Sequence, residues 1–183
     1  MPRFILQLIA ALPALLLAAC AGAPTQAPLK TVEHLDLDRY MGRWYVIANI
    51  PYILEEGKVA TYDTYAKRDD GWMDNSFSFR RGSLDAPEVT WKGKAKVSNP
   101  ASNAEWTVQF IWPFTAPYRV IDLDPDYRWA VVGHPDRSLM WVLSRQTTLA
   151  EPIYQGILQR AAAQGFDTSK LARILQPVQP ATP

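Results

Sequence analysis

The chain has 183 residues and a nearly balanced charge, 19 Lys and Arg against 18 Asp and Glu, so it lacks the basic field typical of nucleic-acid-binding proteins. Its single cysteine excludes an intramolecular disulfide, and its two histidines have no neighbours at metal-ligand spacing, so the sequence predicts no metal site and no cofactor. Aromatic residues reach 11%, with 7 Trp and 8 Tyr, which suits an apolar binding cavity.

Residues 1–19 have the features of a bacterial lipoprotein signal peptide. Arg3 precedes an apolar run that is too short and too interrupted for a transmembrane span. The sequence Leu17-Ala18-Ala19-Cys20 predicts that Cys20 receives acyl chains such as palmitate, which would anchor the mature chain in a membrane. In Gram-negative lipoproteins an Asp after the cysteine resembles an inner-membrane retention signal, so Ala21 favours the outer membrane, with the protein facing the periplasm. The alternative is an ordinary secretory signal in which Cys20 has no special role.

The composition then divides the chain into a tether, one domain and a tail. Residues 20–31 are rich in Ala, Pro, Gly and Thr, which predicts a flexible tether, and residues 179–183 are expected to be a disordered tail. Residues 32–178 suffice for one domain. Within it, runs of β-branched and aromatic residues alternate with turn sequences and predict strands over 43–50, 59–67, 72–80, 88–97, 105–112, 118–123, 127–132 and 139–144, with a further short strand near 174–175.

Eight short strands joined by tight turns predict either a β-sandwich or an antiparallel up-and-down barrel. Apolar residues at every second position, as at Trp106, Val108 and Phe110, indicate strands with one face turned toward a core or a cavity. The pattern changes to a helical period over 151–164, where Pro152 is tolerated in the first turn and Gly165 can end the helix in a left-handed conformation. This amphipathic helix is expected to pack outside the barrel.

Three short motifs resemble those of the lipocalins. Gly42-Arg43-Trp44-Tyr45 is similar to the first motif, and Asp124-Pro125-Asp126-Tyr127 is similar to the second, although Pro125 departs from the usual sequence. Leu143-Ser144-Arg145 is similar to the third motif. Together they resemble the bacterial lipocalins, the apolipoprotein D-like branch of the family, over residues 32–176. The resemblance implies an all-β fold: an eight-stranded antiparallel up-and-down barrel with one C-terminal α-helix packed outside.

The resemblance also assigns structural roles to the motif residues. In the family the tryptophan lies at the closed end of the barrel and the arginine stacks across it, which implies a cation–π pair between Arg145 and Trp44 worth about 0.5–2 kcal/mol. The structural set, which is not expected to contact ligand, consists of Gly42, Trp44, Tyr45, Asp126, Tyr127 and Arg145.

A lipocalin barrel would hold a small hydrophobic molecule, and the bacterial branch implies a fatty acid or a lysophospholipid. Strand parity counted from Trp44 and the family register predict that the ligand contacts Val46, Ala48, Phe77, Trp91, Trp106, Phe110, Leu139 and Trp141. Polar candidates for the head group are Arg119, Tyr118, Asp63 and Tyr65, each of which would face solvent instead if the register differed by one residue. The alternative is that these residues fill a solid core.

The resemblance implies that the loop over residues 51–56 frames the mouth of the cavity. Its apolar Tyr52, Ile53 and Leu54 can contact ligand, a membrane or a second subunit, so a homodimer is possible.

Two other functional classes remain as alternatives to a lipid carrier without enzymatic activity. One is a lipid hydrolase or isomerase that uses the same cavity, and the other is an envelope interaction module with a filled barrel. His134 lies near Asp136 and Ser138, but in a hairpin turn without a nucleophile elbow, so it is interpreted as an exposed turn residue.

Overall fold

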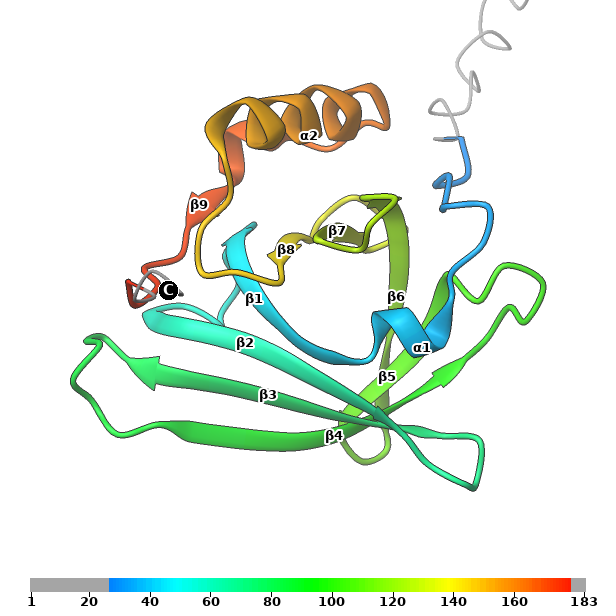
Figure 1. Ribbon diagram of the computed structural model, residues 1–183, viewed down its shortest axis with the longest axis horizontal. Helices are drawn as coiled ribbons and strands as arrows, with labels where there is room; N and C mark the ends of the chain where they lie inside the picture. The colour runs from blue at the N-terminus through cyan, green and yellow to red at the C-terminus, as the bar shows by residue number, and fades with distance from the viewer. Residues whose placement is uncertain (1–26, 179–183) are drawn as a thin grey trace, which may run out of the picture.

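The computed structural model describes residues 27–178; the predicted signal peptide, Cys20 and the predicted tail lie outside this range. Its central feature is a closed antiparallel barrel (Figure 1). The barrel strands follow one another in chain order, and β1 closes the barrel because it pairs with both β8 and β2. Their bounds are β1 Gly42–Asn49, β2 Lys58–Lys67, β3 Met73–Arg81, β4 Val89–Val97, β5 Glu105–Ile111, β6 Phe114–Leu123, β7 Trp129–Gly133 and β8 Met140–Ser144. The predicted up-and-down barrel is confirmed, and the sandwich alternative is excluded.

Three strands have a boundary that differs by two or more residues from the prediction. β6 begins at Phe114, because the chain turns back directly after Ile111. β7 begins at Trp129, because Tyr127 has a left-handed backbone with φ of 60° in the preceding turn. The last short strand, β9, is Ala172–Arg173 and pairs with the end of β1.

The helix α2, Glu151–Ala163, packs against the outside of the barrel as predicted (Figure 1). Pro152 lies in its first turn, where a missing N–H costs nothing. The buried side chains of Tyr154, Ile157 and Ala161 form one face and share an apolar cluster with residues of β7 and β8. After the helix, Gly165 has a φ of 90°, the conformation expected of a helix-ending glycine.

The segment before the barrel also lies on its surface. Residues 27–31, predicted as part of the flexible tether, make definite contacts: Leu29 packs against the cluster beneath α2. Arg137, in the turn between β7 and β8, donates a hydrogen bond of 2.5 Å to the carbonyl oxygen of Ala27. The described chain therefore begins, at Ala27, beside the β7–β8 turn. No helix in residues 27–178 is long and apolar enough to cross a membrane.

One end of the barrel is closed by the short helix α1, Leu37–Tyr40, and by the motif residues. The guanidinium carbon of Arg145 lies 3.7 Å from the centre of the Trp44 ring, which confirms the implied cation–π pair. Arg145 also donates hydrogen bonds of 2.7 and 2.6 Å to the carbonyl oxygens of Arg43 and Arg39. Trp44 is fully buried and donates to the carbonyl oxygen of Tyr40. The Tyr127 hydroxyl accepts a 2.8 Å hydrogen bond from the N–H of Asp36 and so ties the second motif to α1.

Candidate functional site

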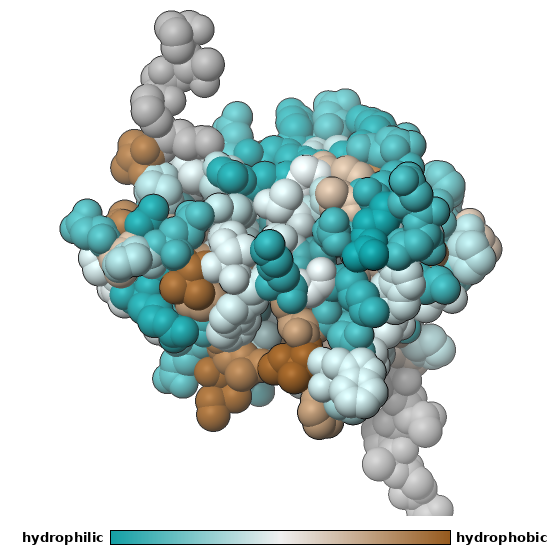
Figure 2. Space-filling view, turned by 90° about the horizontal axis from the view of Figure 1, so that it is seen from below, coloured by the Kyte–Doolittle hydropathy of each residue, from teal (hydrophilic) through white to brown (hydrophobic). Residues whose placement is uncertain are grey.

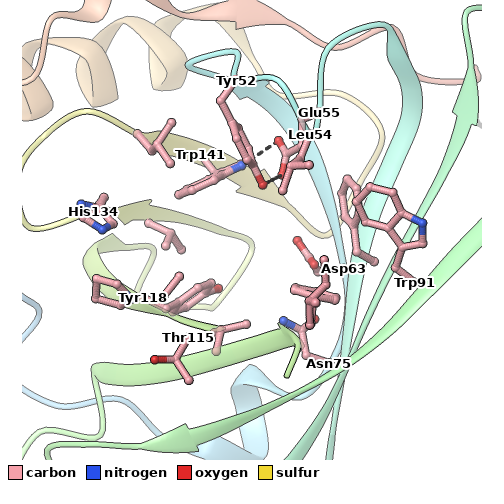
Figure 3. Close-up of a pocket in the computed structure, with 18 of the residues that line it drawn as sticks. Tyr52, Leu54, Glu55, Asp63, Asn75, Trp91, Thr115, Tyr118, His134 and Trp141 are labelled. Atoms are coloured by element: carbon pink, nitrogen blue, oxygen red, sulfur yellow. Dashed lines mark hydrogen bonds between the residues drawn. The ribbon is translucent and has the colours of Figure 1, made fainter. Parts of the chain in front are cut away.

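The barrel encloses a cavity of about 680 Å³ that opens at the end opposite α1. This volume lies within the range of known small-molecule sites. Its wall combines strands β2 to β8 with the loop between β1 and β2 (Figure 3). Apolar and aromatic side chains dominate the wall, among them Tyr52, Leu54, Phe77, Trp91, Val108, Phe110, Ile111, Phe114, Leu139, Trp141 and Leu143.

Five of the predicted ligand contacts lie on the cavity wall. They are Phe77, Trp91, Phe110, Leu139 and Trp141. Phe77 and Trp91 are directly paired across β3 and β4, with ring centres 6.0 Å apart, and together form one side of the wall. The period-two pattern applies at Phe77 and Trp91 because the pairing of β3 with β4 has no register shift.

The other four predicted contacts do not line the cavity. Val46 and Trp106 point inward but belong to the packed core at the closed end, below the cavity, where Trp106 is fully buried among tyrosine rings. Ala48 lies on the outer face, in the cluster beneath α2, because a bulge between Val46 and Ala48 shifts the pairing with β8 and reverses the parity.

Arg119 faces away from the cavity because it follows the inward-facing Tyr118 on β6. Its Nε lies 3.0 Å from a carboxylate oxygen of Glu105, and it donates to the carbonyl oxygen of Trp106. Tyr118 lies on the cavity wall, and Arg119 does not. The cationic head-group contact predicted for Arg119 is therefore wrong.

The inner end of the cavity has a polar floor, defined here as Asp63, Tyr65, Asn75 and Tyr118. The hydroxyl of Tyr118 is 2.8 Å from that of Tyr40 in α1 and receives a 3.1 Å hydrogen bond from Tyr65. Asp63 and Asn75 lie on the adjacent strands β2 and β3 (Figure 3). Burial raises the pKa of the Asp63 carboxyl well above its ordinary value, and nearby Glu55 raises it further.

Glu55 joins the loop between β1 and β2 to the cavity wall. One carboxylate oxygen accepts hydrogen bonds of 2.9 Å from the indole N–H of Trp141 and 2.5 Å from the amide of Asn49 (Figure 3). The other accepts a 3.3 Å bond from the Tyr52 hydroxyl. Burial raises the pKa of Glu55, whereas these three donors oppose that rise. Nothing in the sequence indicates this role beyond the position of Glu55 in the predicted mouth loop.

The mouth carries an exposed apolar rim formed by two loops. Ile53 and Leu54 come from the β1–β2 loop, and the other members, Ile111, Trp112 and Phe114, come from the β5–β6 turn. Ile53 and Trp112 are more than four-fifths exposed, at 86% and 82%. Figure 2 shows apolar side chains gathered along one edge of a largely polar face. Exposed clusters of this kind mark surfaces that contact ligands, membranes or other proteins.

His134 differs from its predicted position because its ring lies on the cavity wall (Figure 3). Its Nδ1 is 2.6 Å from Asp136, whose carboxylate also accepts a 2.6 Å hydrogen bond from the Ser138 hydroxyl. These contacts lower the pKa of Asp136 to about 2. Serine and histidine both bind the same carboxylate oxygen, which is not the serine–histidine contact of a catalytic triad. Residues 27–178 contain no cluster of three or more potential metal ligands.

Comparison with known proteins identifies the family. The lipocalin-like domain family matches residues 35–176. The chain is 36% identical over 171 residues to the outer membrane lipoprotein Blc of Escherichia coli K12, covering 92% of this chain and 94% of that protein. It is 27% identical over 165 residues to mouse apolipoprotein D, covering 85% and 81% of the two chains.

A solved structure shows the same fold. Insecticyanin from the tobacco hornworm, Manduca sexta, superposes with a TM-score of 0.64 at 19% sequence identity, covering 84% of this chain and 86% of that one. Lipocalins bind small hydrophobic ligands, and the similarity to Blc supports an outer-membrane, lipid-anchored localisation. The motifs at the closed end, the barrel and these matches agree: the chain belongs to the lipocalin family, in the branch of the bacterial outer-membrane lipoproteins.

Proposed function

We propose that the protein is a carrier that holds the acyl chain of a fatty acid or lysophospholipid in the barrel cavity and makes or breaks no covalent bond. The observation that carries this proposal is the cavity itself, about 680 Å³ in volume, apolar along its wall and open at one end. Burial of hydrocarbon in such a site contributes roughly 0.8 kcal/mol for each CH₂ group. The cavity argues against the alternative of an interaction module with a filled barrel.

We further propose that acyl chains on Cys20 hold the protein on the outer membrane, facing the periplasm. The path of the described tether supports this arrangement, because Ala27 contacts Arg137 in the β7–β8 turn. That turn carries His134 and Leu139, which line the cavity near its mouth. The chain from the anchor therefore reaches the barrel at its open end. An apolar rim at the same end suits exchange of a lipid with the membrane. The same rim could instead contact a second copy of the chain in a homodimer.

The proposal is tested by lipid extraction and titration. The contacts described above all lie within residues 27–178, so a chain that begins at Ala21 keeps them. Mass spectrometry of an organic extract should find one acyl lipid for each protein molecule. After delipidation, titration with hexadecanoic acid or a palmitoyl lysophospholipid should change the tryptophan fluorescence with one-to-one saturation. No bound lipid and no saturable change would refute the carrier function.

Two tryptophan variants locate the signal. Trp91 lines the cavity, so Trp91→Phe should lose much of the fluorescence change. Trp72, which lies near Lys94 and does not line the cavity, provides the matched control. Trp72→Phe should keep the full change. Equal changes in both variants would mean that the lipid binds outside the barrel. Release of free fatty acid from the lysophospholipid would instead favour the enzyme alternative.

A further inference from the structure

The polar floor stands out in a cavity whose wall is largely apolar. Asn75 is only 2% exposed, and its side-chain oxygen has no hydrogen-bond partner within the described residues. Asp63 likewise receives no hydrogen bond from residues 27–178, although its carboxyl lies at the cavity surface (Figure 3). A buried polar group without a partner is destabilising. The Asn75 amide nitrogen, which points toward the cavity, also has no partner within the described residues (Figure 3). Hydrocarbon would leave this nitrogen and the Asp63 carboxyl unpaired, whereas a polar group on the ligand would satisfy them.

The charges around the floor define which polar group fits. The ionisable acids that line the cavity are Glu55 and Asp63, and the cationic or titratable bases on its wall are Lys92 and His134. Lys92 is exposed, and His134 is already paired with Asp136. A carboxylate or phosphate at the floor would therefore lie beside a buried acid without a compensating cation. Burial raises the pKa of Asp63, which favours the neutral carboxylic acid, a group that both donates and accepts hydrogen bonds.

We propose that the polar floor of Asp63, Tyr65, Asn75 and Tyr118 is a binding subsite for an uncharged hydroxyl group at the inner end of an apolar chain. A hydroxyl can accept a hydrogen bond from the Asn75 amide nitrogen, which faces the cavity (Figure 3), and exchange a second one with the Asp63 carboxyl. The ligand class is thus an amphiphile whose buried end carries a hydroxyl, such as an acyl chain hydroxylated near its terminus with its anionic head at the mouth. This inference rests on the proposed carrier function and specifies its ligand.

The test compares two ligands that differ by one group, hexadecanoic acid and 16-hydroxyhexadecanoic acid. In a purely apolar site the hydroxyl weakens binding, because it must leave water without a new partner. The polar floor should reverse this order. We expect the hydroxy acid to bind the delipidated protein at least five-fold more tightly than its parent, measured by isothermal titration calorimetry below the critical micelle concentration of both acids.

Two variants assign the preference to the floor. Asn75→Leu and, separately, Asp63→Leu should reduce or reverse the preference, which is the ratio of the two affinities measured on the same variant. Asp63→Asn, which keeps hydrogen-bonding capacity, should retain it. Ser76→Ala is the matched control, since Ser76 is next to Asn75 on β3 but does not line the cavity. Circular dichroism before each titration identifies any variant that fails to fold, and the remaining variants then decide the outcome.

The outcomes separate the subsite from the carrier function. A preference for the hydroxy acid that is lost in Asn75→Leu or Asp63→Leu supports the subsite. If the unmodified protein binds both acids equally, or the parent acid more tightly, the subsite is refuted and the carrier function stands. If neither acid binds, the carrier function fails and the subsite fails with it.

Discussion

Arg145 should contribute substantially to the stability of the barrel through its contacts at the closed end. Its guanidinium lies 3.7 Å from the centre of the Trp44 ring and donates two short hydrogen bonds to the carbonyl oxygens of Arg43 and Arg39. A partly shielded cation–π pair contributes about 1 kcal/mol, and each charge-assisted hydrogen bond about 1 kcal/mol after allowance for solvent. Arg145→Ala should therefore lower the free energy of unfolding by about 2–4 kcal/mol.

Thermal and urea unfolding of this variant test the reasoning. For a domain of this size, 1 kcal/mol corresponds to roughly 2–4 °C in Tm, so Arg145→Ala should lose about 5–15 °C. Arg145→Lys keeps the charge but loses the forked geometry of the guanidinium, so its Tm should lie between those of the unmodified protein and Arg145→Ala. The exposed Lys96→Ala provides the control and should change Tm by less than about 2 °C. A similarly small change in Arg145→Ala would refute the role of the motif arginine as a clamp on the closed end.

Three further predictions concern the buried acid Asp63, the position of Arg119 outside the cavity, and the packing of Gly133 against Phe166. Burial raises the pKa of Asp63 in the folded state, so the free energy of unfolding should fall as pH rises from about 4 through that pKa. Asp63→Asn removes the ionisable group and should stabilise the protein at pH 7 by about 1.4 kcal/mol for each unit by which the folded-state pKa, up to pH 7, exceeds the unfolded one. Urea unfolding should show that this gain disappears at pH 4; a larger gain at pH 4 would contradict the assignment. Arg119→Ala should leave lipid affinity within two-fold in a fluorescence titration, and a ten-fold loss would place Arg119 in the site after all. At Gly133 a Cβ atom would lie 2.5 Å from the Phe166 ring, so Gly133→Val should lower the free energy of unfolding by about 1–3 kcal/mol. An unchanged Tm would show that the Phe166 ring can move aside without loss of stability.

The fold could be predicted from the sequence because its strongest signals are local. Turn residues separate the strands, and the change to a helical period at residue 151 marks α2 within one residue of its observed start and end. The motifs added the topology, since Trp44 and Arg145 are far apart in sequence but in contact at the closed end. Both kinds of information concern the backbone and the closed end.

The cavity was predicted less completely because its limits depend on three-dimensional details. Parity is reliable only until a bulge intervenes, and the bulge after Val46 moved Ala48 to the outer face. Parity also gives no depth along the barrel axis: Trp106 and Phe110 share a face, yet Trp106 is core and Phe110 is wall. Asn75 was missed although it shares the parity of Phe77, because an inward-facing amide resembles an exposed one in sequence.

The structural set of motif residues and the residues that line the cavity lie in different parts of the barrel. The six residues of the structural set do not line the cavity, and three of them, Trp44, Tyr127 and Arg145, contact α1 or each other at the closed end. Selection among ligands must therefore depend on residues outside this structural set. In this chain those residues are the acids Glu55 and Asp63, the unpaired amide of Asn75 and the exposed rim of the mouth. Two lipocalins with the same motifs can thus differ in ligand through a few inward-facing positions on β2 and β3, and the floor variants described above test that dependence directly.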